Sequence, residues 1–160
     1  NPDVQNFLAN SKKRNQLNAG KNTKNAKEAN FDKQKGLKNI EIKCIPERML
    51  FDITEFTVRP KQPVKLILSN PDLTMHNLVI AKPNSLEKVG IASNEMAKDT
   101  NGLKKNYIPD LDEILWSTPQ LKQNTSYTLR FRAPKKPGQY PYLCTFPGHW
   151  IIMKGVMIVK

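Results

Sequence analysis

The chain has 160 residues, which is enough for one domain with a hydrophobic core plus an appendage, and its formal net charge is +12 at pH 7. The basic residues do not form a motif interleaved with aromatic residues, which argues against a nucleic-acid partner. No stretch of the sequence approaches the roughly 18 apolar residues of a membrane-spanning helix, so we expect no membrane span.

Residues 1–37 are rich in Asn and Lys and poor in apolar residues. The first 38 residues hold nine Lys and Arg against three Asp and Glu, which accounts for half of the net charge. Val4, Phe7 and Leu8 have the spacing of a short helix near the start, whereas the composition beyond Gly20 favours a flexible linker. We therefore interpret residues 1–37 as a basic arm or linker that precedes a domain.

From residue 38 onward, alternating apolar and polar residues predict β-strands. Ile40, Ile42 and Cys44 alternate with polar residues, as expected for a strand with one buried face. The same pattern predicts further strands at residues 49–53, 64–69, 76–80, 114–117, 127–132, 140–144 and 156–159. Turns containing Pro, Gly and Asn separate these short strands, which is typical of an all-β sandwich of two sheets.

One segment of the domain, residues 84–98, predicts a helix instead. Asn84 has the chemistry of an N-cap, and Glu87 follows it three residues later, as in a capping box. Leu86 and Val89 lie three positions apart and predict an apolar face.

The most specific pattern in the chain is a loop that begins at Cys144. Cys144, His149 and Met153 have the spacing C-x4-H-x3-M, and the only other histidine is His76. Two imidazoles, one thiolate and one thioether are the donors of a blue-copper electron-transfer site. The sulfur ligands suit Cu(I) and the imidazoles suit Cu(II), so this set favours the transfer of single electrons over bond chemistry. We predict one copper ion, cycling between Cu(I) and Cu(II), at these four residues.

The loop Cys144-Thr-Phe-Pro-Gly-His149, followed by Met153-Lys-Gly, resembles the copper loop of the azurins and auracyanins. The upstream His76-Asn77 pair resembles the same family, and the resemblance covers about residues 38–160. It implies a two-sheet Greek-key cupredoxin sandwich with one extra helix at about 84–98, preceded by the basic N-terminal arm.

The resemblance also implies roles for residues next to the ligands. By this resemblance, His76 is expected to be a buried equatorial ligand, His149 an exposed equatorial ligand, and Met153 the axial ligand. Backbone N–H groups of Asn77 and Phe146 donate to the thiolate. The side chain of Asn77 bonds to Thr145.

Two further positions near the copper loop follow from the same comparison. Azurins have Gly before the upstream histidine, where this chain has Met75, so the Met75 carbonyl is a candidate for a weak axial contact. Pro147 and Trp150 flank His149 and are candidates for an apolar patch on which redox partners dock.

These features predict an electron-transfer protein or domain, not an enzyme. Copper oxidases and nitrite reductases place a histidine directly after the ligand cysteine, and here that residue is Thr145. Two alternatives stay open. The first is a copper-binding module of a multidomain oxidoreductase in which catalysis occurs on another domain, and the second is a copper storage or delivery protein.

We expect a monomeric domain whose partners are redox proteins such as a c-type cytochrome or a dehydrogenase domain. The sequence begins at Asn1 instead of Met, which is expected of a processed protein or an excised piece and is compatible with an extracytoplasmic, periplasmic or secreted, location. With Cys144 assigned to copper, Cys44 has no disulfide partner in the chain and is interpreted as a buried core thiol.

Overall fold

The computed structural model describes residue 21 and residues 23–160, and the chain divides between Lys35 and Gly36 into two units. In the first unit, residue 21 and residues 23–32 are helical. The expectation of a flexible linker beyond Gly20 is therefore wrong for this stretch, because its Ala, Lys and Glu residues are good helix formers even without a large apolar face. The helix expected around Val4 lies outside the described residues.

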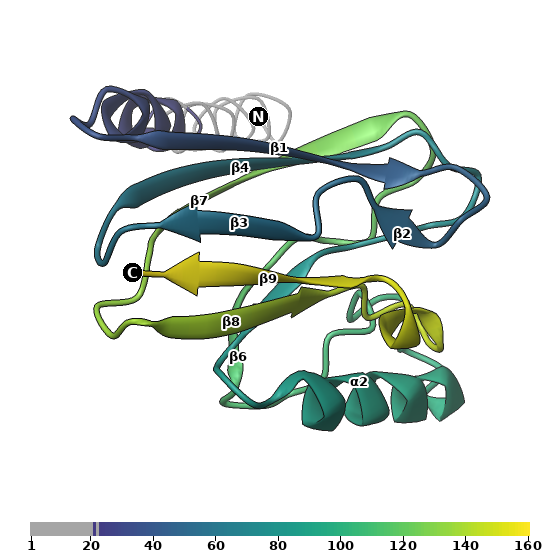
Figure 1. The fold of residues 1–160 in the computed structure, drawn as a ribbon. Helices are drawn as coiled ribbons and strands as arrows, with labels where there is room; N and C mark the ends of the chain where they lie inside the picture. The colour runs from purple at the N-terminus through teal and green to yellow at the C-terminus, as the bar shows by residue number, and fades with distance from the viewer. Residues whose placement is uncertain (1–20, 22) are drawn as a thin grey trace, which may run out of the picture. The chain divides into compact units, whose positions relative to one another are not determined.

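The second unit is a sandwich of two β-sheets (Figure 1). One sheet has the strand order β2-β1-β4-β7, and the other has the order β3-β9-β8-β5-β6. The strands are β1 (Lys38–Ile45), β2 (Leu50–Phe51), β3 (Glu55–Val58), β4 (Pro63–Asn70), β5 (Val79–Ala81), β6 (Ile114–Ser117), β7 (Thr125–Arg132), β8 (Gly138–Leu143) and β9 (Lys154–Val159). Strands β1 and β4 pair in parallel, as do β3 and β9, and the remaining pairs are antiparallel. The predicted all-β two-sheet sandwich is confirmed.

The alternation seen in the sequence places apolar side chains between the sheets. In β1, Ile40, Ile42 and Cys44 are buried while the residues between them are exposed. Cys44 is 1% exposed, and burial raises the pKa of its thiol to about 12. It lies in the core among apolar residues, as a small hydrophobic side chain does.

The expected helix is present as α2 (Leu86–Glu95), followed by a 3-10 turn, η1 (Met96–Lys98). Its N-cap is Ser85 and not the expected Asn84. Asn84 has a left-handed φ of 62°, so it belongs to the preceding turn. The Ser85 hydroxyl donates to the Lys82 carbonyl instead of capping the helix, and the predicted capping box is therefore wrong.

The strands differ from the prediction at three places. The strand expected at residues 49–53 is only Leu50–Phe51, which is β2. Strand β3 (Glu55–Val58) is present where the sequence pattern predicted none. The strand expected at residues 76–80 begins only at Val79, and His76 instead forms an isolated bridge with Leu121. This bridge anchors the backbone of His76 at one end of the sandwich.

The strand pairing defines two ends of the sandwich. Leu143, the last residue of β8, pairs with Lys154 at the start of β9, and Gly138 pairs with Val159 at the other end. The loop from Cys144 to Met153 therefore closes the first of these ends. Within the described part of the chain, no helix has the length and apolar character needed to cross a membrane.

Candidate metal centre

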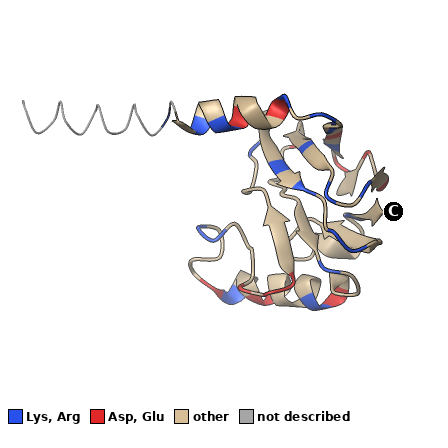
Figure 2. Ribbon diagram, turned by 90° about the vertical axis from the view of Figure 1, so that its left-hand side faces the viewer, with Lys and Arg blue, Asp and Glu red and all other residues tan. Residues whose placement is uncertain are grey.

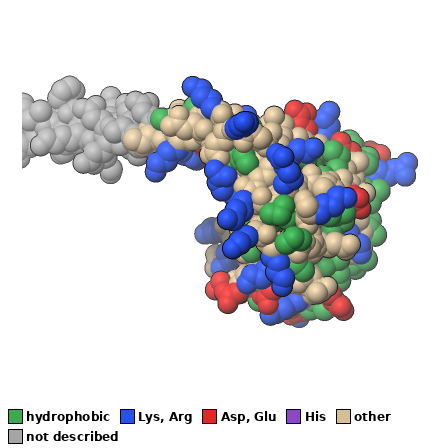
Figure 3. Space-filling view, turned by 60° about the vertical axis from the view of Figure 1, so that its left-hand side comes forward, with side chains coloured by type: hydrophobic (Ala, Val, Ile, Leu, Met, Phe, Trp, Pro, Cys, Tyr) green, Lys and Arg blue, Asp and Glu red, His purple; other side chains and the backbone are tan. Residues whose placement is uncertain are grey.

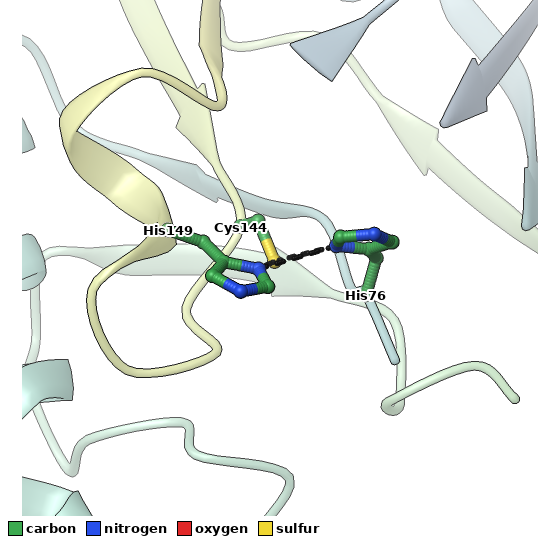
Figure 4. Close-up of side chains that lie close together, drawn as sticks. All are labelled: His76, Cys144 and His149. Atoms are coloured by element: carbon green, nitrogen blue, oxygen red, sulfur yellow. Dashed lines mark hydrogen bonds between the residues drawn. The ribbon is translucent and has the colours of Figure 1, made fainter. Parts of the chain in front are cut away.

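Three side chains from separate parts of the fold converge at this end of the sandwich (Figure 4). Cys144 directly follows β8, His149 begins the 3-10 turn η2 (His149–Ile151), and His76 lies between β4 and β5. The Sγ atom of Cys144 is 3.8 Å from Nδ1 of His76 and 3.7 Å from Nδ1 of His149, and the two nitrogens are 3.2 Å apart. All three residues are buried.

The triangle formed by these three atoms has the size of a metal site. The point equidistant from the three atoms lies about 2.1 Å from each of them. Metal–nitrogen bonds to histidine are about 2.0–2.1 Å and metal–thiolate bonds are about 2.3 Å. The donor atoms of this chain therefore fit a single ion without rearrangement.

A buried carboxylate orients the first imidazole. The Asp72 Oδ2 atom lies 2.8 Å from Nε2 of His76, and the two side chains are 5% and 0% exposed. This hydrogen bond lowers the pKa of Asp72, so its carboxylate is ionised and accepts the proton of the His76 Nε2–H group. In that tautomer the lone pair of Nδ1 faces Cys144 and His149, as a metal ligand requires.

His149 is more enclosed than the sequence predicts. It is 7% exposed, whereas His76 is fully buried, so the expectation of an exposed imidazole is wrong in degree. The Phe146 ring packs on it with 4.6 Å between ring centroids. Burial, together with the nearby His76, lowers the pKa of His149 to about 4, so the imidazole is neutral at physiological pH and can offer a lone pair.

The Cys144 thiol is held protonated by its surroundings in the absence of a cation. Burial raises its pKa to about 11, and this effect is partly offset by hydrogen bonds from the backbone N–H groups of Asn77 and Phe146. A metal ion in the triangle would supply the charge that displaces the proton. The two N–H groups then stabilise the sulfur anion.

A pair of hydrogen bonds joins the two chain segments that carry the donors. The Asn77 Nδ2 atom donates to Oγ1 of Thr145 at 2.7 Å, and the Thr145 backbone N–H donates to Oδ1 of Asn77 at 2.7 Å. Both side chains are fully buried. Because Asn77 follows His76 and Thr145 follows Cys144, this pair fixes the separation of two donors.

Met153 and Met75, the two methionines considered as copper contacts, differ in placement. Met153 is fully buried, its carbonyl accepts the Cys144 N–H at 3.0 Å, and its N–H donates to the His149 carbonyl at 2.9 Å. Its backbone thus closes the loop between the two donor residues. Met75 is half-buried directly before His76, and an axial contact from its carbonyl stays a prediction.

Helix α2 holds the loop through residues that the sequence did not single out. The Gly148 N–H donates to Oδ1 of Asn94 at 2.7 Å. The indole of Trp150 lies so close to Gly90 that a Cβ atom there would be 2.1 Å from the ring. Gly90 and Asn94 are four residues apart and therefore lie on one face of the helix. This spacing is the feature of the sequence from which their shared contact with the loop could have been predicted.

The apolar surface next to His149 extends beyond the two residues predicted to form the docking patch. Trp150 is half-buried against α2, so much of its ring is a packing surface. Pro147 is half-buried as well. The following residues Ile151 and Ile152 are 57% and 47% exposed, and they supply the larger apolar surface beside the loop.

Comparisons with known proteins agree with this geometry. A family model of copper-binding proteins, the plastocyanin/azurin family, matches residues 38–160. Auracyanin-A of Chloroflexus aurantiacus is 33% identical over 123 residues, which cover 76% of this chain and 74% of that protein. Azurin of Alcaligenes faecalis is 33% identical over 107 residues, which cover 64% of this chain and 77% of that protein.

A solved structure gives the same result. Auracyanin A, described as a "blue" copper protein from the green thermophilic photosynthetic bacterium Chloroflexus aurantiacus, matches with a TM-score of 0.70 and 31% sequence identity. The match covers 78% of this chain and 100% of that one. The resemblance inferred from the loop Cys144 to Met153 is confirmed.

Proposed function

Because this chain belongs to the plastocyanin/azurin family of copper-binding proteins, we propose that it transfers single electrons through one copper ion held by His76, Cys144, His149 and Met153. The imidazoles of His76 and His149, the thiolate of Cys144 and the thioether of Met153 would hold the ion, which would supply the one-electron couple.

The triangle of donor atoms is the observation that carries this proposal. His76, Cys144 and His149 already stand at bonding distances from a common centre. Hydrogen bonds to the imidazole, to the thiolate and between Asn77 and Thr145 restrain them there. A restrained set changes little between the two oxidation states, and this keeps the reorganisation cost of electron transfer low.

Burial of the donors favours an electron carrier over a copper storage or delivery protein. His76 and Cys144 are fully buried and His149 is 7% exposed, so the ion would exchange slowly with a ligand from another protein. A delivery protein needs donors that a recipient can reach. No step in the proposal requires catalysis by this chain, and the same site serves a free carrier or one domain of a larger oxidoreductase.

We propose that electrons pass at the end of the sandwich that carries His149. The docking patch consists of Pro147, Ile151 and Ile152, with Trp150 as the residue that packs their loop onto α2. Redox encounters use small interfaces that release quickly, so a patch of this size suffices. The partner is a redox protein such as a c-type cytochrome or a dehydrogenase domain, in an extracytoplasmic compartment.

The proposed copper site is tested by removing the thiolate. Cys144→Ser should abolish the intense visible thiolate-to-copper charge-transfer band of the copper-loaded protein. Cys44→Ala, which removes the other thiol from the core, is the matched control and should retain the band. An unchanged band in Cys144→Ser would exclude this cysteine as the ligand.

The docking patch is tested by electron self-exchange between reduced and oxidised protein. Ile151→Glu places a charge in the patch, and two such patches must meet in the reaction, so exchange should slow while the optical spectrum stays unchanged. Ile91→Glu is the control, because Ile91 is 51% exposed on α2 and is not part of the patch. Equal rates for the two variants would place the electron-transfer surface elsewhere.

A further inference from the structure

A cavity of about 700 Å³, open to solvent, lies at the end of the sandwich away from the metal centre. It is lined by residues at the end of β7, at the start of β8 and after β5, including Arg132, Gly138 and Lys82. Strand β8 separates it from Cys144, and a rise of about 3.3 Å per residue puts Gly138 about 20 Å from that cysteine. The cavity is therefore distinct from the copper loop.

Most of the wall of this cavity is apolar. Trp116 and Tyr140 present aromatic rings, and Pro83, Pro134 and Pro137 restrict the backbone around them. Trp116 stacks on the core residue Phe131 with 4.4 Å between ring centroids. The Tyr140 hydroxyl donates to the Lys136 carbonyl at 2.9 Å. A cavity of this volume with an aromatic side chain in its wall has the dimensions of a small-molecule site.

The charged residues of the lining are all cations. Lys82, Arg132 and Lys136 line the cavity, and no Asp or Glu is among its lining residues. The Arg132 Nη1 atom donates to the Lys61 carbonyl at 3.2 Å, which fixes the guanidinium at the rim. The Glu113 carbonyl accepts the backbone N–H of Lys82, and the Glu113 carboxylate is paired with Lys88. The hydrogen bond from Lys88 and, more weakly, the charge of Lys82 lower the pKa of this carboxyl, so Glu113 offsets part of the charge of Lys82.

Figures 2 and 3 look toward this end of the sandwich, and Figure 3 shows Lys and Arg side chains surrounding a group of hydrophobic ones. The strand termini explain this distribution. Lys38 begins β1, Arg132 ends β7, and Lys160 follows β9, all at the same end. Positive charge at a mouth with apolar walls attracts anions and raises their local concentration.

From this combination we infer a second binding site, for a small organic anion that carries a flat apolar ring. The ring packs against Trp116, beside the largely buried ring of Tyr140, and the anionic group meets Lys82 and Lys136 at the rim. The shape selects against an inorganic anion, which would leave the aromatic walls uncovered. The cations select against a neutral ring of the same size.

The test uses 2-naphthoate as the probe and the full chain in its reduced, diamagnetic copper form. Amide shifts in two-dimensional NMR should saturate with 2-naphthoate and map to the cavity, including Leu115, Trp116 and Tyr140. The neutral analogue 2-naphthylmethanol should bind about tenfold more weakly, and acetate should cause no saturable shift there.

Paired charge variants separate this site from general attraction to a basic protein. Lys82→Gln/Lys136→Gln should weaken binding of 2-naphthoate about tenfold and bring it to the level of the alcohol. Lys104→Gln/Lys122→Gln, which removes the same charge from loops outside the lining, should leave binding unchanged.

Three results would overturn the proposal. The first is equal binding of 2-naphthoate and its neutral analogue, and the second is equal weakening by the two double variants. The third combines two observations: the protein binds anionic phosphatidylglycerol vesicles and 2-naphthoate does not release it, and 2-naphthoate does not shift the resonances of Trp116 and Tyr140. That last result would assign the basic end to a lipid surface.

Discussion

The hydrogen bond between Asp72 and His76 should set part of the reduction potential of the copper. Asp72 carries a buried negative charge at 2.8 Å from Nε2 of His76, a proposed copper ligand. Such a charge stabilises Cu(II) more than Cu(I), because Cu(II) has one more positive charge, and it therefore lowers the potential. Asp72→Asn keeps the size of the side chain and an oxygen that accepts the His76 proton, but it removes the charge.

The magnitude follows from the position of the carboxylate. A charge bound to Nδ1 of His76 would be roughly 7 Å from a carboxylate that bonds to Nε2. At an effective dielectric constant of about 20, two unit charges at this separation interact by about 2 kcal/mol. For a one-electron couple this corresponds to roughly 100 mV, so Asp72→Asn should raise the potential by up to that amount.

Voltammetry of the copper-loaded protein at neutral pH measures this shift directly. Asp112→Asn is the matched control, because it removes the same charge from an exposed position in the loop before β6. Solvent and salt screen that carboxylate, so its removal should change the potential by no more than about 10 mV. The optical band should persist in both variants, since neither changes a ligand.

A lowered potential in Asp72→Asn, or a shift no larger than that of Asp112→Asn, would refute the electrostatic argument. Loss of the optical band would instead show that the substituted amide fails to orient His76, and the tautomer would then depend on the ionised carboxylate. Metal affinity of the Asp72→Ala variant measures that second effect, because alanine removes the acceptor altogether.

Three further predictions address the rest of the site. Gly90→Ala should lower the free energy of unfolding of the copper-loaded protein by about 1–3 kcal/mol and perturb its optical spectrum, because the added Cβ overlaps Trp150. If denaturant unfolding and the optical spectrum show both unchanged, the helix does not hold the loop. Met153→Leu should leave copper bound and raise the potential, since it removes a donor that favours Cu(II); a lowered potential measured by voltammetry would argue against axial ligation. Deletion of residues 1–35 should leave the optical spectrum and copper stoichiometry unchanged, because all four proposed ligands lie in the second unit; a lost band would move the domain boundary.

The copper loop and the class of fold could be read from the sequence because their signals are local. Cys144, His149 and Met153 lie within ten consecutive residues, and the turn between them is encoded by Pro147 and Gly148. Alternation within each strand depends only on neighbouring residues, so it predicted the sandwich and the burial of Cys44. Strand β3 also alternates, with Phe56 and Val58 buried, but its pairing with the remote strand β9 is visible only in the structure.

The surroundings of the metal centre depended on contacts between distant segments. His76 and Cys144 are 68 residues apart, and only the order of the strands brings their donor atoms to 3.8 Å. Asp72 is close to His76 in sequence, but it lies on a loop whose course no periodicity describes. Its role as acceptor was therefore not visible in the chain.

The sequence by itself predicted the loop from Cys144 to Met153 and the sandwich, because the loop lies within ten consecutive residues and the alternation of each strand depends only on neighbouring residues. The tertiary structure alone decided how far His149 is buried, how Gly90 and Asn94 of α2 hold the loop, and how Lys82 and Lys136 meet around an apolar cavity. Each of these arises from packing between segments that are remote in the chain, and packing depends on the whole arrangement of sheets and helix.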